Sequence, residues 1–502
     1  MPTKLEHLRN LLGEVFDLHA TAAVLEWDQQ VNMPRGGAAN RAAALSTISR
    51  LAHETFVSDA MGAALEAAAD EARDLDPDSD DARLVRKARR DYDKARRVPP
   101  DYVAEFSRAT SLAHEAWERA RPANDFASFR PHLETVFRLR RTYADFFAPY
   151  AHRYDPLLDD FEPGLTTPQV RAVFDELRPR QVALVRAIVE GGRPVDNSLM
   201  RRGYDVDLQW AFGLDVARAF GYDFERGRQD KSAHPFTTRF GLGDVRITTR
   251  LYPHLLSSSI LSTMHETGHA LYDQGSAPEL DRTPLLGGSS LVIHESQSRL
   301  WENMVGRSLP FWKAFFPRLR ELFPQQLADV DVETFHRAMN KVEPSFIRIE
   351  ADEATYNLHI MLRFDLELAI TEDALSIADL PAAWNDKMQE YLGLTPPNDT
   401  NGVMQDVHWS GGILGYFPTY ALGNLVAAQL WERINADLPD LSRQIERAQF
   451  ADLLGWLRTH IHRHGSKFDA DELLQRVVGG GLSAGPYLRY LETKYDEIYG
   501  LH

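Results

Sequence analysis

Two histidines near the middle of the chain have the spacing of a metal-binding pair. His265 and His269 enclose Glu266 in the sequence HETGH. On an α-helix these histidines lie one turn apart on one face, so both imidazoles can reach a single Zn²⁺ ion. Glu266 then lies beside the metal, where a carboxylate can take the proton of the attacking water. The pattern indicates a hydrolytic zinc site; the alternative is a chance match on a surface helix.

A catalytic zinc ion usually has three protein ligands and one open position. The chain contains no cysteine, so the third ligand must be a histidine, an aspartate or a glutamate. Glu295 follows the glycine-containing segment 286–289, in a region that we expect to form a second helix packed against the first. We interpret Glu295 as the third ligand. On the residues alone, a solvated carboxylate is an equally good interpretation.

The histidine pair requires a helix that is buried on its other side. Ser257, Ser258 and Ser259 are expected to cap the start of this helix, because their hydroxyls can accept hydrogen bonds from its free N–H groups. Met264, Gly268 and Leu271 offer an apolar side. We expect Gly268 to allow a neighbouring helix to approach closely.

Apolar residues recur every three to four positions along most of the chain, which predicts a mainly α fold. Examples are Leu5, Leu8, Leu12 and Val15; Val332, Phe335, Met339 and Val342; and Phe450, Leu453, Leu457 and Ile461. Without a clear linker, residues 1–502 are expected to form one large domain. Segment 234–252 is the exception: it predicts a β-hairpin, with Asp244–Thr248 as the edge strand that holds an extended substrate.

Two other clusters of polar residues are weaker candidates for function. His460, His462 and His464 are expected to be surface histidines near a helix end rather than a second metal site. A basic group formed by Arg86, Lys87, Arg89 and Arg90 is expected to be a solvated helix face.

The overall composition excludes several classes of function. The formal net charge of −17 opposes binding to nucleic acid. No segment approaches the apolar length of a membrane span or of a signal peptide. Together with the lack of cysteine, this predicts a cytoplasmic protein that does not bind membranes.

Several blocks of sequence resemble one known family. HETGH at 265–269 and HESQSRLWEN at 294–303 resemble the thermostable metallocarboxypeptidases of the carboxypeptidase Taq type. Further matching blocks, in order, are EWDQQVNMPRGGAANR at 26–41, HPF at 234–236, DVRIT at 244–248, IRIEAD at 347–352, GVMQDVHW at 402–409 and LETKYDEIYGL at 491–501. The resemblance therefore covers nearly the whole chain.

The resemblance implies a fold, a reaction and a set of roles. The fold would be a large helical body with a deep active-site groove and a small β-hairpin or sheet beside it, similar to angiotensin-converting enzyme and neurolysin. The protein would be a homodimer that removes C-terminal amino acids from peptides with broad specificity. His265, His269 and Glu295 would bind one Zn²⁺ per subunit, and Glu266 would act as general base and acid. Co²⁺ or Mn²⁺ could replace zinc, because this ligand set does not select one metal.

Other matching blocks supply candidates for substrate binding. Arg348 is our candidate for the terminal carboxylate, because a guanidinium can donate two parallel hydrogen bonds to it. The alternative is an ion pair with Asp352 within one helix. By similarity, His408 and one of Tyr416 or Tyr420, with Tyr416 preferred, would face the oxyanion of the tetrahedral intermediate.

Three further residues have more general roles. Asp406 is expected to fix the tautomer of a neighbouring imidazole. His234 and Arg246 would line the substrate groove together with Asp244, the first residue of the predicted edge strand. Buried structural hydrogen bonding is an equally good interpretation for His234 and Arg246.

The predicted activity is thus that of a zinc-dependent carboxypeptidase acting on peptides with a free C-terminus. Two alternatives remain open from the sequence. An oligoendopeptidase could use the same metal site, and an inactive peptide-binding protein could keep the fold without catalysis. The three proposed metal ligands and Glu266 are all present, which disfavours the inactive protein.

Overall fold

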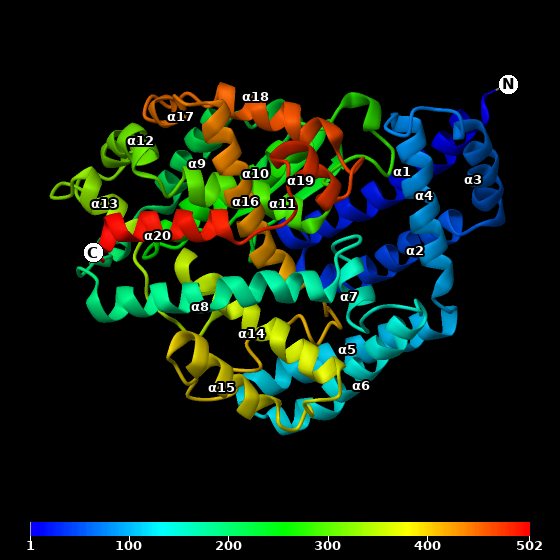
Figure 1. Ribbon diagram of the computed structural model, residues 1–502, viewed down its shortest axis with the longest axis horizontal. Helices are drawn as coiled ribbons and strands as arrows, with labels where there is room; N and C mark the ends of the chain where they lie inside the picture. Colours follow the sequence, from blue (N-terminus) through cyan, green and yellow to red (C-terminus); the bar gives the residue numbers. More distant parts are fainter. Residues whose placement is uncertain (1, 502) are drawn as a thin grey trace. The chain divides into compact units, whose positions relative to one another are not determined.

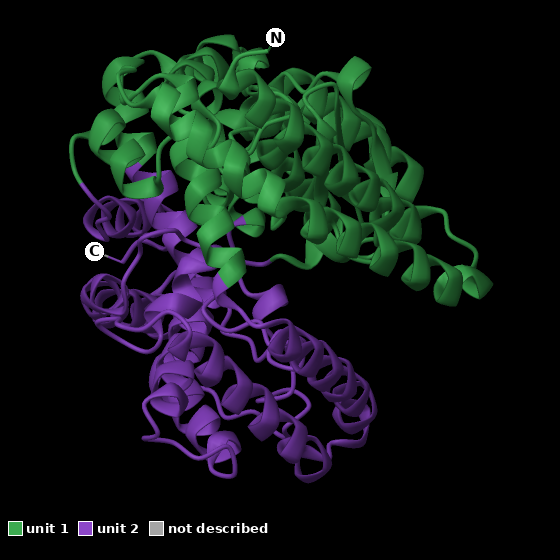
Figure 2. Ribbon diagram, turned by 90° about the vertical axis from the view of Figure 1, so that its right-hand side faces the viewer, with its two compact units in different colours: residues 1–96, 197–339, 430–480 green, residues 97–196, 340–429, 481–502 purple. Residues whose placement is uncertain are grey.

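The computed structural model describes residues 2–501, which are mainly helical with one small sheet, as the sequence predicts (Figure 1). The chain forms two compact units, each assembled from three separate segments (Figure 2). Unit 1 contains residues 1–96, 197–339 and 430–480, and unit 2 contains residues 97–196, 340–429 and 481–502. The assignment of residues 1–502 to one domain stays a prediction.

Unit 1 contains the N-terminal helices and the sheet. Its helices are α1 Lys4–Val31, η1 Arg35–Gly37, α2 Ala38–Phe56, α3 Asp59–Ala72, α4 Asp80–Arg97, η2 Ser198–Arg201, α9 Val206–Phe220, η3 Phe224–Arg226, α10 Leu256–Gln274, η4 Pro278–Leu280, α11 Leu291–Arg299, the π-helix η5 Leu300–Val305, α12 Leu309–Leu322, α13 Val332–Met339, α17 Leu441–Ile445, α18 Ala451–His460, η7 His462–His464 and α19 Ala470–Val478. The last residue of α4 belongs to unit 2.

The first helix shows how the sequence determines local structure. Thr3 accepts a hydrogen bond from the backbone of Glu6, and Glu6 accepts one from the backbone of Thr3, so α1 begins with a capping box. The predicted apolar face of α1 is buried against α3 and α4. This cluster contains Leu5, Leu8, Leu12, Val15, Met61, Leu65, Leu84, Val85 and Tyr92.

The sheet has three strands in the order β1-β3-β2, namely β1 Gln229–Lys231, β2 Thr237–Gly241 and β3 Asp244–Thr249. The predicted hairpin is present, because β2 and β3 pair in antiparallel fashion. However, β3 also pairs with β1 in parallel, so Ile247 has a partner on both sides. The prediction that Asp244–Thr248 is an edge strand is therefore wrong. The edges are β1 and β2, and β1 was not predicted because it is only three residues long.

Up to residue 501, the regular elements of unit 2 are all helices. They are α5 Pro100–Ala123, α6 Phe126–Asp145, α7 Asp155–Asp159, α8 Thr167–Gly191, η6 Arg348–Glu350, α14 Glu353–Thr371, α15 Leu380–Leu392 and α20 Gly485–Tyr499; α16 Phe417–Asp437 begins in unit 2 and ends in unit 1. Helix α14 is buried along almost its whole length and contacts α6, α8 and α15. It therefore forms the centre of this unit.

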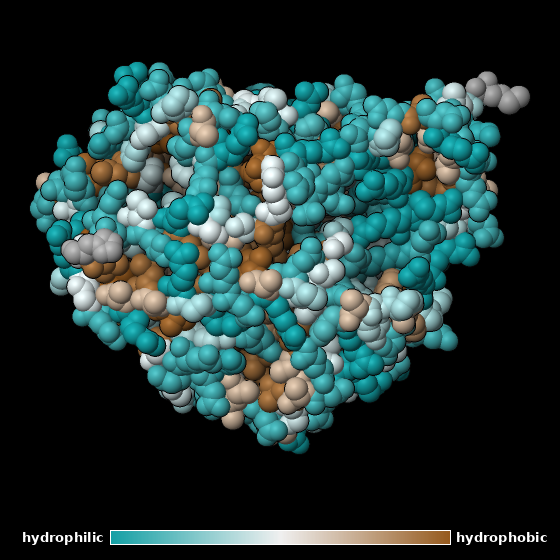
Figure 3. Space-filling model, in the orientation of Figure 1, coloured by the Kyte–Doolittle hydropathy of each residue, from teal (hydrophilic) through white to brown (hydrophobic). Residues whose placement is uncertain are grey.

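Figure 3 shows the hydropathy of one face of the molecule. The face drawn in Figure 3 is largely hydrophilic, with hydrophobic atoms in scattered patches. The basic residues of α4 lie on a solvated helix face, as predicted, where Lys87 pairs with Asp91 and Arg89 with Asp93. Across residues 2–501, no helix has both the length and the apolar character needed to cross a bilayer.

Candidate metal centre and catalytic residues

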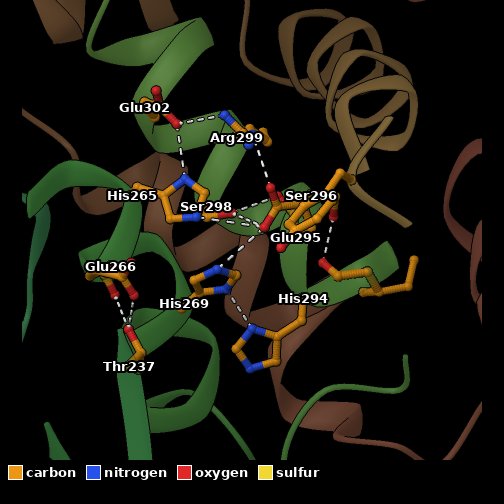
Figure 4. Close-up of polar contacts among 12 residues, drawn as sticks. Thr237, His265, Glu266, His269, His294, Glu295, Ser296, Ser298, Arg299 and Glu302 are labelled. Carbon is orange, nitrogen blue, oxygen red and sulfur yellow. Dashed lines mark hydrogen bonds and ion pairs between the residues drawn. The ribbon is translucent and has the colours of Figure 1, made fainter. Parts of the chain in front are cut away.

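Helices α10 and α11 bring the three predicted metal ligands together (Figure 4). One ligand atom from each of His265, His269 and Glu295 lies within 4.8 Å of the other two. The Nε2 atoms of the two histidines are 3.6 and 3.5 Å from Glu295 Oε2. Both imidazoles thus present the same nitrogen toward one carboxylate oxygen. No second group of this kind occurs among the described residues.

Close contact between the two helices depends on Gly268. A Cβ atom at this position would lie 2.7 Å from the backbone oxygen of Gln297 and 2.7 Å from Ser298 Cα. The predicted role of this glycine is therefore confirmed. The predicted serine cap is wrong: α10 begins at Leu256 without a side-chain cap, and the hydroxyl of Ser259 instead donates to Gln209 Oε1 over 2.6 Å.

The outer nitrogen of each histidine also has a partner. His265 Nδ1 is 2.9 Å from Glu302 Oε2, and His269 Nδ1 is 2.5 Å from His294 Nδ1. Arg299 donates from Nε to Glu295 Oε1 over 2.7 Å and from NH1 to Glu302 over 3.1 Å. These contacts orient both rings and the carboxylate.

Glu302, Arg299 and His294 were not predicted as functional residues. A signal was present, since Glu295, Arg299 and Glu302 follow one another at spacings of four and three, which places them on one helix face. The π-helix η5 begins just after Arg299 and contains Glu302. Short π-helical turns occur often at functional sites.

The electrostatics of the site favour a cation. Burial raises the pKa of Glu295, but Arg299, His265 and His269 outweigh it and hold the pKa below its usual range. Burial also opposes ionisation of Glu302, yet Arg299 and His265 lower its pKa to about 2. Burial lowers the pKa of His269 to about 4, so this imidazole is neutral at pH 7. For His265, burial is outweighed by Glu295 and Glu302, which raise its pKa.

This donor set fits a zinc ion. Two imidazole nitrogens and a carboxylate oxygen are one of the ligand sets of catalytic zinc. Here these three atoms converge, and His265 Nδ1 and Glu295 Oε1 have other partners. With Glu295 and Glu302 ionised, their negative charge faces Arg299, Arg307 and the nearby histidines.

Glu266 lies on the same helix and is 6% exposed. Thr237 of β2 donates to its Oε2 over 2.7 Å, so the edge strand holds the carboxyl group in place (Figure 4). Burial raises the pKa of Glu266, and His265 and Thr237 offset this only in part. A raised pKa makes this carboxyl group a better proton acceptor than an exposed glutamate.

The predicted groove residues of unit 1 pair with each other. Arg246 donates from Nε and NH2 to the two oxygens of Asp244 over 2.8 and 2.7 Å. Its guanidinium carbon lies 4.3 Å from the centre of the Trp27 ring. His234 is exposed in the loop before β2, so the interpretation of His234 as a buried structural residue is wrong.

The predicted substrate residues of unit 2 gather around Asp406. Arg348 donates from Nε and NH2 to Asp406 Oδ1 over 3.0 and 2.9 Å, and from NH1 to Tyr356 over 3.1 Å. Arg363 donates to the other oxygen of Asp406 over 2.7 Å. The alternative pairing of Arg348 with Asp352 is wrong, because Asp352 caps α14.

His408 and the two candidate tyrosines form one aromatic group. The ring centre of His408 is 5.6 Å from that of Tyr416 and 6.4 Å from that of Tyr420. His408 Nδ1 lies 3.9 Å from Asp406, which is too long for a hydrogen bond. Asp406 thus binds guanidinium groups, and the predicted control of an imidazole tautomer is not found. Burial lowers the pKa of His408 to about 4.

The three histidines near the C-terminal end do not form a surface group as predicted. His462 is fully buried and its Nε2 is 2.9 Å from Gln297 Oε1. His460 ends α18 and packs on Trp456, and His464 packs on Phe468. That they form no second metal site stays a prediction.

Comparison with known proteins assigns this arrangement to a family. Residues 7–495 match the family model described as the carboxypeptidase Taq (M32) metallopeptidases. The chain is 44% identical to thermostable carboxypeptidase 1 of Thermus thermophilus over 99% of both chains. It is 36% identical to carboxypeptidase 1 of Bacillus subtilis over 98% of this chain and 97% of the relative.

Solved structures agree with this assignment. The crystal structure of an M32 carboxypeptidase from Deinococcus radiodurans matches with a TM-score of 0.97 at 43% identity, over 99% of this chain and all of that one. Metallocarboxypeptidase 1 of Trypanosoma cruzi matches with a TM-score of 0.94 at 33% identity, over 98% and 99%. The chain therefore belongs to the carboxypeptidase Taq (M32) family and is a metallocarboxypeptidase.

Proposed function

We propose that this metallocarboxypeptidase uses one Zn²⁺ ion per subunit to remove C-terminal amino acids, with broad specificity, from peptides with a free C-terminus. The observation that carries the proposal is the convergence of His265, His269 and Glu295 beside the buried carboxyl group of Glu266. Co²⁺ and Mn²⁺ are substitutes that the same ligands could accept.

Each residue of the metal centre has a defined task. Bound zinc would supply Lewis-acid chemistry, polarising the scissile carbonyl and making a water molecule acidic near neutral pH. Glu266 would accept a proton from the attacking water at Oε1 or Oε2 and donate it to the nitrogen of the departing amino acid. Thr237 would donate to Oε2 of that carboxyl group and so help to orient it.

Arg348 is our candidate for recognition of the terminal carboxylate. It is 6% exposed, and together with Arg363 it shares the single carboxylate of Asp406. Two guanidiniums against one carboxylate leave a net positive charge in a buried place, which a substrate carboxylate would neutralise. Asp406 would then orient Arg348 for the substrate, and His408 with Tyr416 or Tyr420 would donate to the oxyanion.

The remaining proposals rest on similarity to the family. Asp244, Arg246 and His234 are assigned to the substrate groove, residues 1–502 to one catalytic domain, and the protein to a cytoplasmic homodimer. The mutual ion pair of Asp244 and Arg246 supports a fixed orientation of Arg246. Gel filtration with light scattering tests the dimer directly.

The decisive experiment compares a blocked dipeptide that has a free C-terminus with the same peptide carrying a C-terminal amide. Each is incubated with the purified protein, with the protein after chelation, and with Glu266→Gln. Cleavage of the free-carboxylate peptide alone, abolished by chelation and by the substitution, supports the proposal. Equal cleavage of the amide supports an oligoendopeptidase. No cleavage of either peptide despite bound zinc supports a peptide-binding protein and contradicts the proposal.

A further inference from the structure

The two histidines of the proposed metal site are held by different kinds of partner. His265 Nδ1 faces a carboxylate, that of Glu302, whereas His269 Nδ1 faces a second imidazole, that of His294. Ligand histidines usually donate their second N–H to a carboxylate, a carbonyl oxygen or water. His269 departs from this arrangement, because the partner of its Nδ1 atom is an imidazole nitrogen.

His294 continues into a chain of hydrogen bonds that ends on a charged pair. Its Nε2 atom is 3.3 Å from Asp273 Oδ1, and Asp273 is paired with the guanidinium of Arg239. Arg239 also donates from NH2 to the backbone oxygen of Leu286 over 3.2 Å. The order is thus His269, His294, Asp273 and Arg239, and all four residues belong to unit 1.

Metal binding by His269 selects one direction for the protons in this chain. Its Nε2 atom must have a free lone pair, so the ring proton must be on Nδ1. His294 Nδ1 must then accept that proton, which leaves the proton of His294 on Nε2, facing Asp273. The opposite direction would put a proton on His269 Nε2 and block coordination.

We propose that His294, with Asp273 and Arg239 behind it, is a positioning residue that fixes the orientation and tautomer of His269 for metal binding. This inference rests on the proposed metal site of His265, His269 and Glu295. It assigns to His294 a role outside the ligand set, because its own nitrogens are engaged by His269 and Asp273.

Two glycines show that the chain of contacts is built into the fold. A Cβ atom at Gly288 would lie 2.7 Å from His294 Cδ2. A Cβ atom at Gly287, where φ is +94°, would lie 2.1 Å from Arg239 NH1. Tyr272 closes another side of His294, with ring centres 5.3 Å apart. Only a loop without side chains at these two positions leaves room for both His294 and Arg239.

The first test replaces His294 with phenylalanine, which fills similar space but accepts no hydrogen bond. Zinc affinity is measured by competition with a chelating dye, and the Co²⁺-loaded protein is examined by its visible absorption spectrum. We expect zinc affinity to fall about 10- to 100-fold and the spectrum to change. His294→Gln, which keeps an acceptor and a donor, should restore part of the affinity. His464→Phe, a histidine that packs on Phe468, is the matched control.

A double-mutant cycle distinguishes a role of this chain of hydrogen bonds from a general effect on stability. Asp273→Asn should weaken zinc binding less than His294→Phe does. If the residues act in series, Asp273→Asn should have no further effect on zinc affinity once His294 is phenylalanine. Thermal unfolding of each metal-free variant shows whether it is folded.

The outcomes distinguish this inference from the proposal on which it rests. A folded His294→Phe protein with wild-type zinc affinity and an unchanged Co²⁺ spectrum overturns the role of His294. The role of His294 is also overturned by a second result. In that result, His294→Phe and His294→Gln lose equal zinc affinity, and the effects of Asp273→Asn and His294→Phe on zinc affinity add in full in the double variant. If His269→Ala binds zinc as tightly as the unaltered protein, the metal site itself is wrong.

Discussion

The hydroxyl of Thr237 lies 2.7 Å from Glu266 Oε2 and 3.0 Å from the backbone oxygen of the same residue. An edge strand thus contacts the proposed general base at two points. Because a threonine hydroxyl has one proton, it can donate to only one of these oxygens at a time. The contact ties the position of strand β2 to the orientation of the catalytic carboxyl group.

Thr237→Val should therefore slow peptide hydrolysis by about tenfold, since it removes one hydrogen bond worth about 1.4 kcal/mol while keeping the side-chain size. Thr237→Ser keeps the donor and should stay near the original rate. The measurement is kcat for a free-carboxylate dipeptide at saturating zinc. A valine variant as fast as the unaltered protein would show that Glu266 needs no help from the strand.

Gly268→Ala should disturb the metal site through packing alone. The added methyl group meets backbone atoms of α11 at 2.7 Å, which should destabilise the protein by about 1–3 kcal/mol and weaken zinc binding as α11 shifts. Gly455→Ala is the control, because this glycine lies inside α18 with open space around it. That variant should gain about 0.5–1 kcal/mol. Chemical denaturation measures both.

Asp406→Asn should be strongly destabilising, because it leaves the buried guanidiniums of Arg348 and Arg363 without their shared carboxylate. Breaking a buried ion pair in this way costs about 3–5 kcal/mol. Asp352→Ala, which removes a helix cap, should cost only about 1 kcal/mol. Comparable losses in the two variants would show that the Asp406 cluster is largely solvated.

His462 should make the protein sensitive to mild acid. Burial lowers its pKa in the folded state to about 3, whereas an unfolded histidine has a pKa near 6.5. Below about pH 6.5 the unfolded chain takes up a proton that the folded chain does not, so stability falls as the pH drops.

Between pH 6.5 and 5 this single group should account for about 1.6 kcal/mol of that loss. His462→Gln should flatten the dependence by this amount, as measured by urea unfolding at a series of pH values. Identical slopes for the His462 variant and the unaltered protein would contradict the assignment.

The sequence predicted those features that depend on local spacing. The positions of His265 and His269, the packing role of Gly268 and the hairpin of β2 and β3 each follow from a periodicity or from a residue type. The position of β3 within the sheet could not be predicted, because pairing with the short strand β1 depends on distant residues.

The residues that contact Glu266 and His294 also could not be predicted from local sequence patterns. Thr237 reaches Glu266 across 29 positions of sequence, and Asp273 reaches His294 across 21. For Arg348, local spacing suggested a wrong partner. The nearby Asp352 suggested an ion pair within one helix, whereas the actual partner, Asp406, is 58 positions away. Contacts of this range arise from the packing of helices and not from the spacing within one helix.

The division of each unit into three segments has a consequence for synthesis of the chain on the ribosome. Helix α1 emerges first, yet Trp27 at its end packs on Arg228 and Arg246, about two hundred residues later. Unit 1 is complete only when residue 480 has been made, and unit 2 only with the last residues. Part of the apolar surface of the nascent N-terminal helices therefore stays exposed until the later segments of unit 1 have left the exit tunnel. A metal ion present during translation would find its first ligand pair only after residue 269 has emerged.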